Sequence, residues 1–255
     1  MKGIITLSKE INFDIVLAEA IKLPIVRIDR EEFLRTSLSK YFDANTINKA
    51  ISKNPASAGI CVDKIAEIAK SCIDYETTKV TLLSAAAGVP GGLAIVGTVP
   101  ADLAQYFAHV IRILQKLIYL YGWKELFDEN GQMDDETKNL LTLFVGIMFG
   151  VNSAVGAVAK ISDVVAQNIA KNLAKQPLTK GFIYPIVKQV ARYIGVQMTK
   201  EIFAKGVAKI VPLIGGLVSG TLTYATYKPM AIRLQKHLSK MNIAAPDFYT
   251  TAKDF

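Results

Sequence analysis

The clearest helix that the sequence predicts is residues 102–123, which read DLAQYFAHVIRILQKLIYLYGW. Apolar side chains recur in this stretch every three or four residues, so one face of the helix is apolar. Gly122 is placed to end the helix, because glycine readily adopts the left-handed conformation that closes a helix C-terminus. The opposite face is polar and carries Asp102, Gln105, His109 and Arg112. We interpret this face as one that meets solvent or another helix.

The same spacing extends the helical prediction to both sides of this segment. It predicts helices at 11–21, where Pro24 ends the helix, at 31–41, at 62–73, at 137–175 as one helix or two, and at 181–208. The sequence therefore predicts an all-α fold, a multi-helix bundle with glycine-rich apolar helical hairpins. We divide the chain into an N-terminal helical region at 1–75, a glycine-rich helical domain at 76–240 and a frayed C-terminal tail at 241–255.

Three apolar stretches carry no charged residue, and they lie at 80–101, 139–159 and 210–227. The first contains a Val-Pro-Gly-Gly turn at its middle, which predicts two apolar arms joined as a helical hairpin. The second has about the 20 residues needed to cross a bilayer core, but Asn152 and Ser153 near its centre make it a marginal span. Pro212 and Pro229 flank the third.

Glycines four residues apart recur in all three stretches, where one helix turn separates them. The pairs are Gly88 and Gly92, Gly146 and Gly150 with Ala154 continuing the row, and Gly216 and Gly220, with Gly91 and Gly215 beside them. Such a stripe lets another backbone approach closely, as in pairs of membrane helices. For any single pair, a close crossing inside a soluble bundle explains the spacing equally well. Three pairs together favour helices that pack inside a bilayer or rearrange to reach one.

Composition and charge narrow the class of protein. The chain has 255 residues, of which 51% are hydrophobic and 20% charged, enough to build a sizeable core. Residues 1–150 carry 16 basic and 18 acidic side chains, whereas residues 151–255 carry 14 basic and 4 acidic ones. This asymmetry indicates an anionic partner for the C-terminal part, or a solvated basic face. A nucleic acid is the weaker partner because the basic residues are spread singly and form no reading motif.

Two features predict a cytoplasmic location, either free or at the cytoplasmic face of the membrane. Cys61 and Cys72 lie 11 residues apart in one predicted helical stretch, too far for a disulfide, so we interpret them as buried thiols. Charged residues interrupt residues 1–20, so no signal peptide is expected there.

No motif in the sequence assigns a reaction, a cofactor or a metal. The stretch from Gly92 to Val99 begins like a phosphate-binding loop but has threonine in place of its lysine. The acidic run at 128–139 lacks the glycine and the closing glutamate of a calcium loop. Asp102 and His109 are two helix turns apart, roughly 10 Å, which is too far for a direct hydrogen bond. With two histidines and two cysteines, a zinc site is not expected.

Four short motifs carry a family resemblance: VPGGL at 89–93, VPADL at 99–103, YLYGW at 119–123 and IVPLIGGLVSG at 210–220. On these motifs the chain resembles the EcsC protein family across residues 80–238, and it is also similar to a domain of unknown function found on some bacterial GTPases. The resemblance implies a bacterial, mostly helical protein associated with membranes or membrane transport machinery. It implies no catalytic residues.

The first hypothesis is a non-enzymatic, membrane-associated helical protein that docks its apolar glycine-rich hairpins into lipid or a membrane partner. The alternative is a soluble all-α module that binds an apolar ligand such as a lipid tail. An enzyme that acts on a lipid-like substrate through Asp102 and His109 has the least support. A second copy of the chain is a further candidate partner.

Overall fold

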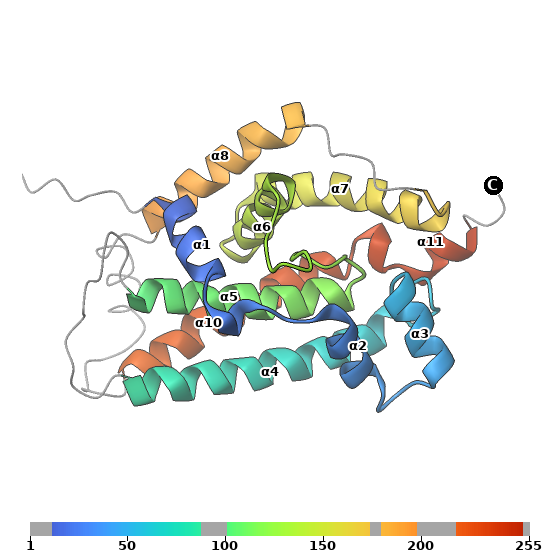
Figure 1. Ribbon diagram of the computed structural model, residues 1–255, viewed down its shortest axis with the longest axis horizontal. Helices are drawn as coiled ribbons and strands as arrows, with labels where there is room; N and C mark the ends of the chain where they lie inside the picture. Colours follow the sequence, from blue (N-terminus) through green and yellow to red (C-terminus); the bar gives the residue numbers. More distant parts are fainter. Residues whose placement is uncertain (1–11, 88–100, 174–179, 198–217, 252–255) are drawn as a thin grey trace, which may run out of the picture.

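The computed structural model describes residues 12–87, 101–173, 180–197 and 218–251 (Figure 1). Every regular element in these ranges is helical, and they contain no strand, so the predicted all-α bundle is confirmed. The α-helices are α1 (Phe13–Ile21), α2 (Arg30–Leu38), α3 (Ala44–Ser52), α4 (Val62–Ala87), α5 (Ala101–Leu120), α6 (Asp135–Met148), α7 (Asn152–Ala170), α8 (Lys180–Gln197), α10 (Val218–Leu238) and α11 (Pro246–Thr251). Two 3-10 turns are η1 (Pro24–Val26) and η2 (Asn242–Ala244).

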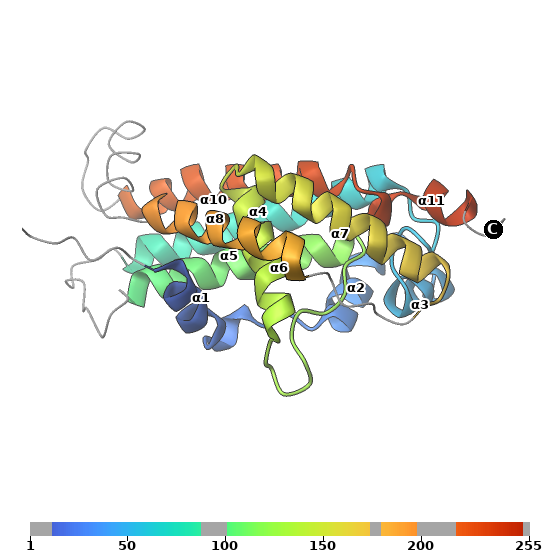
Figure 2. The ribbon, with the colours of Figure 1, turned by 90° about the horizontal axis from the view of Figure 1, so that it is seen from above.

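Helix α5 lies at the centre of the bundle. It packs beside α4 and α10, and α1, α2 and η1 cover it on another side (Figure 1). Helix α6 is seen along its axis in Figure 1 and from its side in Figure 2, so it crosses the other helices steeply. Helices α7 and α8 both pack against α6. The core therefore surrounds α5, whose side chains from Phe107 to Leu120 are buried apart from Arg112 and Lys116, which are partly exposed.

Short polar side chains fix where several helices begin. Asp29, Asp43 and Asp134 each accept a hydrogen bond from a backbone N–H in the first turn of α2, α3 and α6. These bonds satisfy donors that a helix start leaves without partners, and the negative charge suits the positive end of the helix dipole. At the other end of α5, Gly122 has φ of +96° and Trp123 N–H donates to Ile118 O at 2.9 Å. The predicted stop at Gly122 is confirmed.

Residues 137–175 form two helices, α6 and α7, which is one of the two predicted alternatives, and Pro229 lies inside α10 with its ring exposed. Two predictions from the sequence need correction. The tail is not frayed throughout, because α11 packs through Tyr249, whose hydroxyl accepts from Asn54 Nδ2 at 2.7 Å. Cys61 is exposed and not a buried thiol.

The division of the chain at residue 75 stays a prediction, and α4 runs continuously through that position. In the described ranges no helix combines the length and the apolar character needed to cross a membrane. The stretch at 139–159, which looked marginal as a span, is interrupted by the turn between α6 and α7.

Candidate functional site

Four helix ends gather at one end of the molecule. Figures 1 and 2 show the last residues of α4 and α8 and the first residues of α5 and α10 at the same, left-hand end. We call these four helix ends the apolar end. The sequence between α4 and α5 and the sequence between α8 and α10 both start and finish there. These connections contain the VPGGL and IVPLIGGL motifs, so two apolar stretches distant in sequence are attached to one end of the bundle.

Large apolar side chains are exposed close to these helix ends. Leu82, five residues before the end of α4, is 65% exposed, and Tyr224, near the start of α10, is 47% exposed. Val196, next to the last residue of α8, is also exposed. Single exposed apolar side chains are ordinary on a protein surface, and these three lie close to helix ends from which the two connections start or at which they finish.

Most of the predicted glycines lie outside the described residues. This holds for Gly88, Gly91, Gly92, Gly215 and Gly216. Gly220 lies in the first turn of α10. The predicted hairpin at 80–101 is described only over its first eight residues, which form the end of α4, and over its last residue, which begins α5. Packing by these glycines stays a prediction.

Gly146 is described, and it allows a close helix contact. A Cβ atom at this position would lie 2.6 Å from Val190 Cγ1 of α8 and 3.0 Å from the Cβ of Ala154 of α7. Glycine is therefore what lets α7 and α8 approach α6 at this point. This contact is the close crossing of buried helices that the spacing also allowed.

Gly150 has a different role. Its φ of +83° follows the end of α6, and Val151 N–H donates to Gly146 O at 2.9 Å. Gly150 therefore ends α6 and forms the turn to α7. It does not continue a stripe on one helix, which corrects that part of the expectation.

The predicted polar face of α5 meets α4 and not only solvent. Gln105 is exposed, Asp102 lies in the first turn of α5, and His109 and Arg112 face inward. Glu76 of α4 has a fully buried side chain, and its Oε1 accepts from Lys116 Nζ at 2.5 Å and from Arg112 Nε at 3.3 Å. The polar face is thus an interhelical ion cluster.

Burial and charge act in opposite directions on Glu76. Desolvation raises the pKa of its carboxyl, but Lys116, Arg112 and Lys79 together outweigh that effect and hold the pKa below its ordinary value. Burial lowers the pKa of His109, and Arg112 adds to this while Glu76 opposes it. His109 Nδ1 has no hydrogen-bond partner within the described part of the chain. Both shifts favour a negative Glu76 and a neutral His109 at neutral pH.

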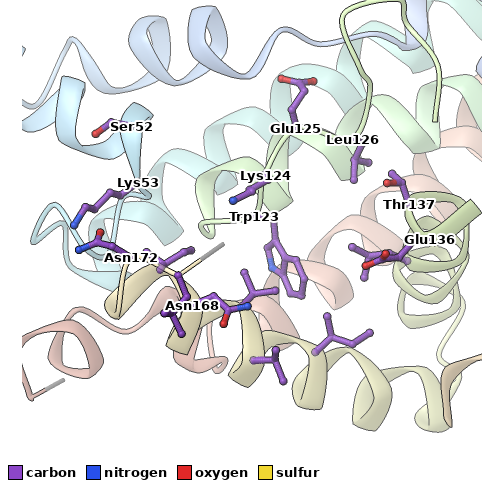
Figure 3. Close-up of a pocket in the computed structure, with 16 residues that line it drawn as sticks. Ser52, Lys53, Trp123, Lys124, Glu125, Leu126, Glu136, Thr137, Asn168 and Asn172 are labelled. Atoms are coloured by element: carbon purple, nitrogen blue, oxygen red, sulfur yellow. The ribbon is translucent and has the colours of Figure 1, made fainter. Parts of the chain in front are cut away.

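A cavity of about 380 Å³ lies away from the apolar end, and Figure 3 shows its lining. Its walls come from the end of α3, the α5–α6 connection, the start of α6 and the second half of α7. Apolar lining residues are Trp123, Leu126, Leu140, Ile161, Val164, Val165, Ile169 and Leu173. Polar lining residues are Ser52, Lys53, Lys124, Glu125, Glu136, Thr137, Asn168 and Asn172.

Arg30 links two of the segments that form the walls of this cavity. Its buried guanidinium donates to the carbonyl oxygens of Trp123 at 3.0 Å and Ile51 at 2.8 Å. The same side chain reaches the carbonyl oxygen of Lys53, so it supplies donors to the end of α3, where helix carbonyls lack partners. Arg30 N–H donates to Glu125 Oε2 at 2.9 Å, which fixes the α5–α6 connection against the start of α2.

Sequence reasoning missed both Glu76 and the cavity. Glu76 falls three residues after Ile73 and four before Val80, so it is an acidic residue within the buried stripe of α4. An acid at an apolar position is a signal that its partner lies on a neighbouring helix. The residues that line the cavity are spread over positions 52 to 173, and no local sequence pattern predicts it. In the described ranges no three histidine, cysteine, aspartate or glutamate side chains gather to hold a metal ion.

No protein-family model matches the chain, and comparisons with curated proteins and with solved structures give no match. The resemblance to the EcsC family stays a prediction from its short motifs.

Proposed function

We propose that the protein is a non-enzymatic helical protein that docks onto a membrane, or onto a membrane protein, through its apolar end. The observation that carries the proposal is the shared position of the ends of α4, α5, α8 and α10. Through them the uncharged stretches that contain VPGGL and IVPLIGGL belong to one end of the bundle. A bilayer or an apolar partner surface would meet the bundle at the end where both connections are attached.

Two further properties support docking at this end. Leu82 and Tyr224 expose apolar area that contributes roughly 25 cal/mol per Å² when it leaves water. The connection between α8 and α10 also carries Lys200, Lys205 and Lys209 before its uncharged part. Basic residues beside apolar ones add attraction to the anionic lipids of a membrane surface.

The test is co-sedimentation of the full chain with vesicles of phosphatidylglycerol and phosphatidylcholine. Leu82→Glu places a charge at the apolar end, and we expect it to reduce the bound fraction. Val164→Glu is the matched control, because Val164 is also exposed but lies on α7 at the cavity. Both variants change the net charge equally, so a difference between them reports position. Equal binding by the two variants and the parent chain contradicts docking through the apolar end.

The glycines of the third apolar stretch allow a second test. Gly216→Leu combined with Gly220→Leu is expected to weaken membrane or partner association. Fractionation of cells followed by carbonate and high-salt washes separates the modes of association. Release by salt indicates that the basic residues bind, whereas resistance to both washes indicates inserted apolar segments.

The cavity supports a second candidate function, binding of an apolar ligand. Its volume of about 380 Å³ falls within the range of small-molecule sites, and half of its lining residues are apolar. Organic extraction of the denatured protein, followed by mass spectrometry, is expected to release an apolar molecule in a fixed ratio to protein. A preparation without any extractable molecule contradicts an occupied cavity.

A further inference from the structure

The floor of the cavity is an apolar stripe of α7. Ile161, Val165 and Ile169 follow one another at helical spacing, and Val164 and Leu173 beside them are about half exposed. Ala154, in the first turn of α7, lies against Gly146 of α6, whereas Ile161, Val165 and Ile169 line the cavity. The stripe therefore suits the apolar body of a small ligand.

Most of the polar groups around this floor are hydrogen-bond donors that have no acceptor in the described part of the chain. Lys53 and Lys124 form no ion pair there, and the side-chain amides of Asn168 and Asn172 have no hydrogen bond there. Trp123 is only 3% exposed, and its Nε1 also has no partner within the described residues. A buried donor without a partner costs about 1–3 kcal/mol, which an acceptor on a ligand recovers.

The acidic residues at the cavity are already engaged. Glu125 accepts from Tyr119 Oη at 2.7 Å and from the backbone N–H of Arg30. Glu136 has an interaction of its own and lies with Thr137 on the other side of the cavity from Lys53 and Asn172 (Figure 3). One side of the cavity is therefore cationic and rich in donors.

We propose that this cavity binds a small amphiphilic carboxylate, with its apolar body on the α7 stripe and its carboxylate toward Lys53 and Lys124. The inference rests on the second candidate function and adds the chemistry of the ligand. A carboxylate suits the free donors because charged hydrogen bonds from ammonium groups are the strong ones. Among the described residues that line the cavity none is an arginine, so this part of the lining lacks the forked recognition that often marks a phosphate site.

Trp123 makes the test direct, because it is the single tryptophan of the chain and lines the cavity. Octanoate, octylamine and octanol share one tail and differ in the charge of the head group. Titration of the full chain with each probe, followed by tryptophan emission, reports binding at this position. We expect a saturable change with octanoate, and binding about tenfold tighter than that of octylamine.

Two variants separate the head group from the tail. Lys124→Gln is expected to weaken octanoate about tenfold and to leave octanol unchanged, because only the carboxylate loses a partner. Val164→Glu is expected to block octanoate and octanol, since it places a carboxylate on the apolar floor at an exposed position that tolerates substitution. Leu82→Glu, at the apolar end, is the matched control and is expected to bind octanoate as the parent chain does.

The outcomes distinguish this inference from the function on which it rests. Equal binding of octanoate, octylamine and octanol shows an apolar site without preference for a carboxylate and overturns the inference while ligand binding stands. Absence of any saturable change overturns both. Full octanoate binding by Val164→Glu places the ligand elsewhere and also overturns the inference.

Discussion

Replacing Gly146 by alanine tests whether this glycine is required for helix contact. The added Cβ would lie 2.6 Å from Val190 Cγ1 and 3.0 Å from Ala154 Cβ. Neither neighbour yields easily, because Val190 is β-branched and the Ala154 Cβ is attached directly to the backbone of α7. Overpacking of a core typically costs about 1–3 kcal/mol. Alanine recovers about 0.5–1 kcal/mol of helix propensity, so we expect a net loss of about 1–2 kcal/mol.

Gly156→Ala provides the control for propensity. Gly156 lies inside α7, and a Cβ there would have no atom within 4 Å, so alanine should stabilise the protein by about 0.5–1 kcal/mol. Urea unfolding followed by circular dichroism measures both variants against the parent chain. The combination of Gly146→Ala with Val190→Ala should lose less stability than the two single changes added together, because the second removes the clash. A stabilising Gly146→Ala, or strict additivity of the pair, would refute the packing argument.

Three further predictions concern buried polar groups. Glu76→Gln leaves two cations of the α4–α5 cluster without their carboxylate and is expected to cost about 3 kcal/mol in urea unfolding. His109 has a lowered pKa in the folded state, so unfolding takes up protons and stability should decline as the pH falls below about 6.5. His109→Gln should make the stability depend less steeply on pH. The pH dependence that remains is assigned to His237, whose pKa is also lowered by burial and nearby lysines. Tyr249→Phe removes the hydroxyl that accepts from Asn54 and should cost about 1 kcal/mol, whereas a frayed tail would lose nothing.

The helices with strong apolar spacing could be predicted from the sequence, and α5 is the best example. Its predicted stop at Gly122 agrees with the structure, because a positive φ is a local backbone property that a glycine in the sequence predicts. Helix α3 was not predicted, since only Ile47 and Ala50 of its nine residues are buried. Pro229 lies inside α10, where packing along α4 outweighs the local cost of one proline.

The candidate sites were less predictable than the fold. The polar face of α5 was found, but its partner Glu76 depends on the register between two helices that no local pattern contains. The cavity depends on where α3 meets α7, more than 100 residues apart in sequence. Long-range contacts of this kind follow from packing of the whole chain, and single-residue patterns do not encode them.

Side-chain hydrogen bonds and ion pairs join α4, α5 and α10, and we call them polar ties. They explain why the ends of these three helices lie level at the apolar end. Glu76 joins α4 to α5, Tyr227 Oη of α10 donates to His109 O of α5 at 3.2 Å, and Lys228 of α10 pairs with Asp74 of α4 at 2.7 Å. Apolar packing is non-directional and tolerates sliding along the helix axes, whereas each polar tie forms at one register only. Sliding by one turn would break the buried bonds of Glu76 and Tyr227, and each buried group left without a partner costs about 1–3 kcal/mol or more. The ties therefore hold the ends of α4, α5 and α10 at one end of the bundle, the arrangement on which the proposed docking depends.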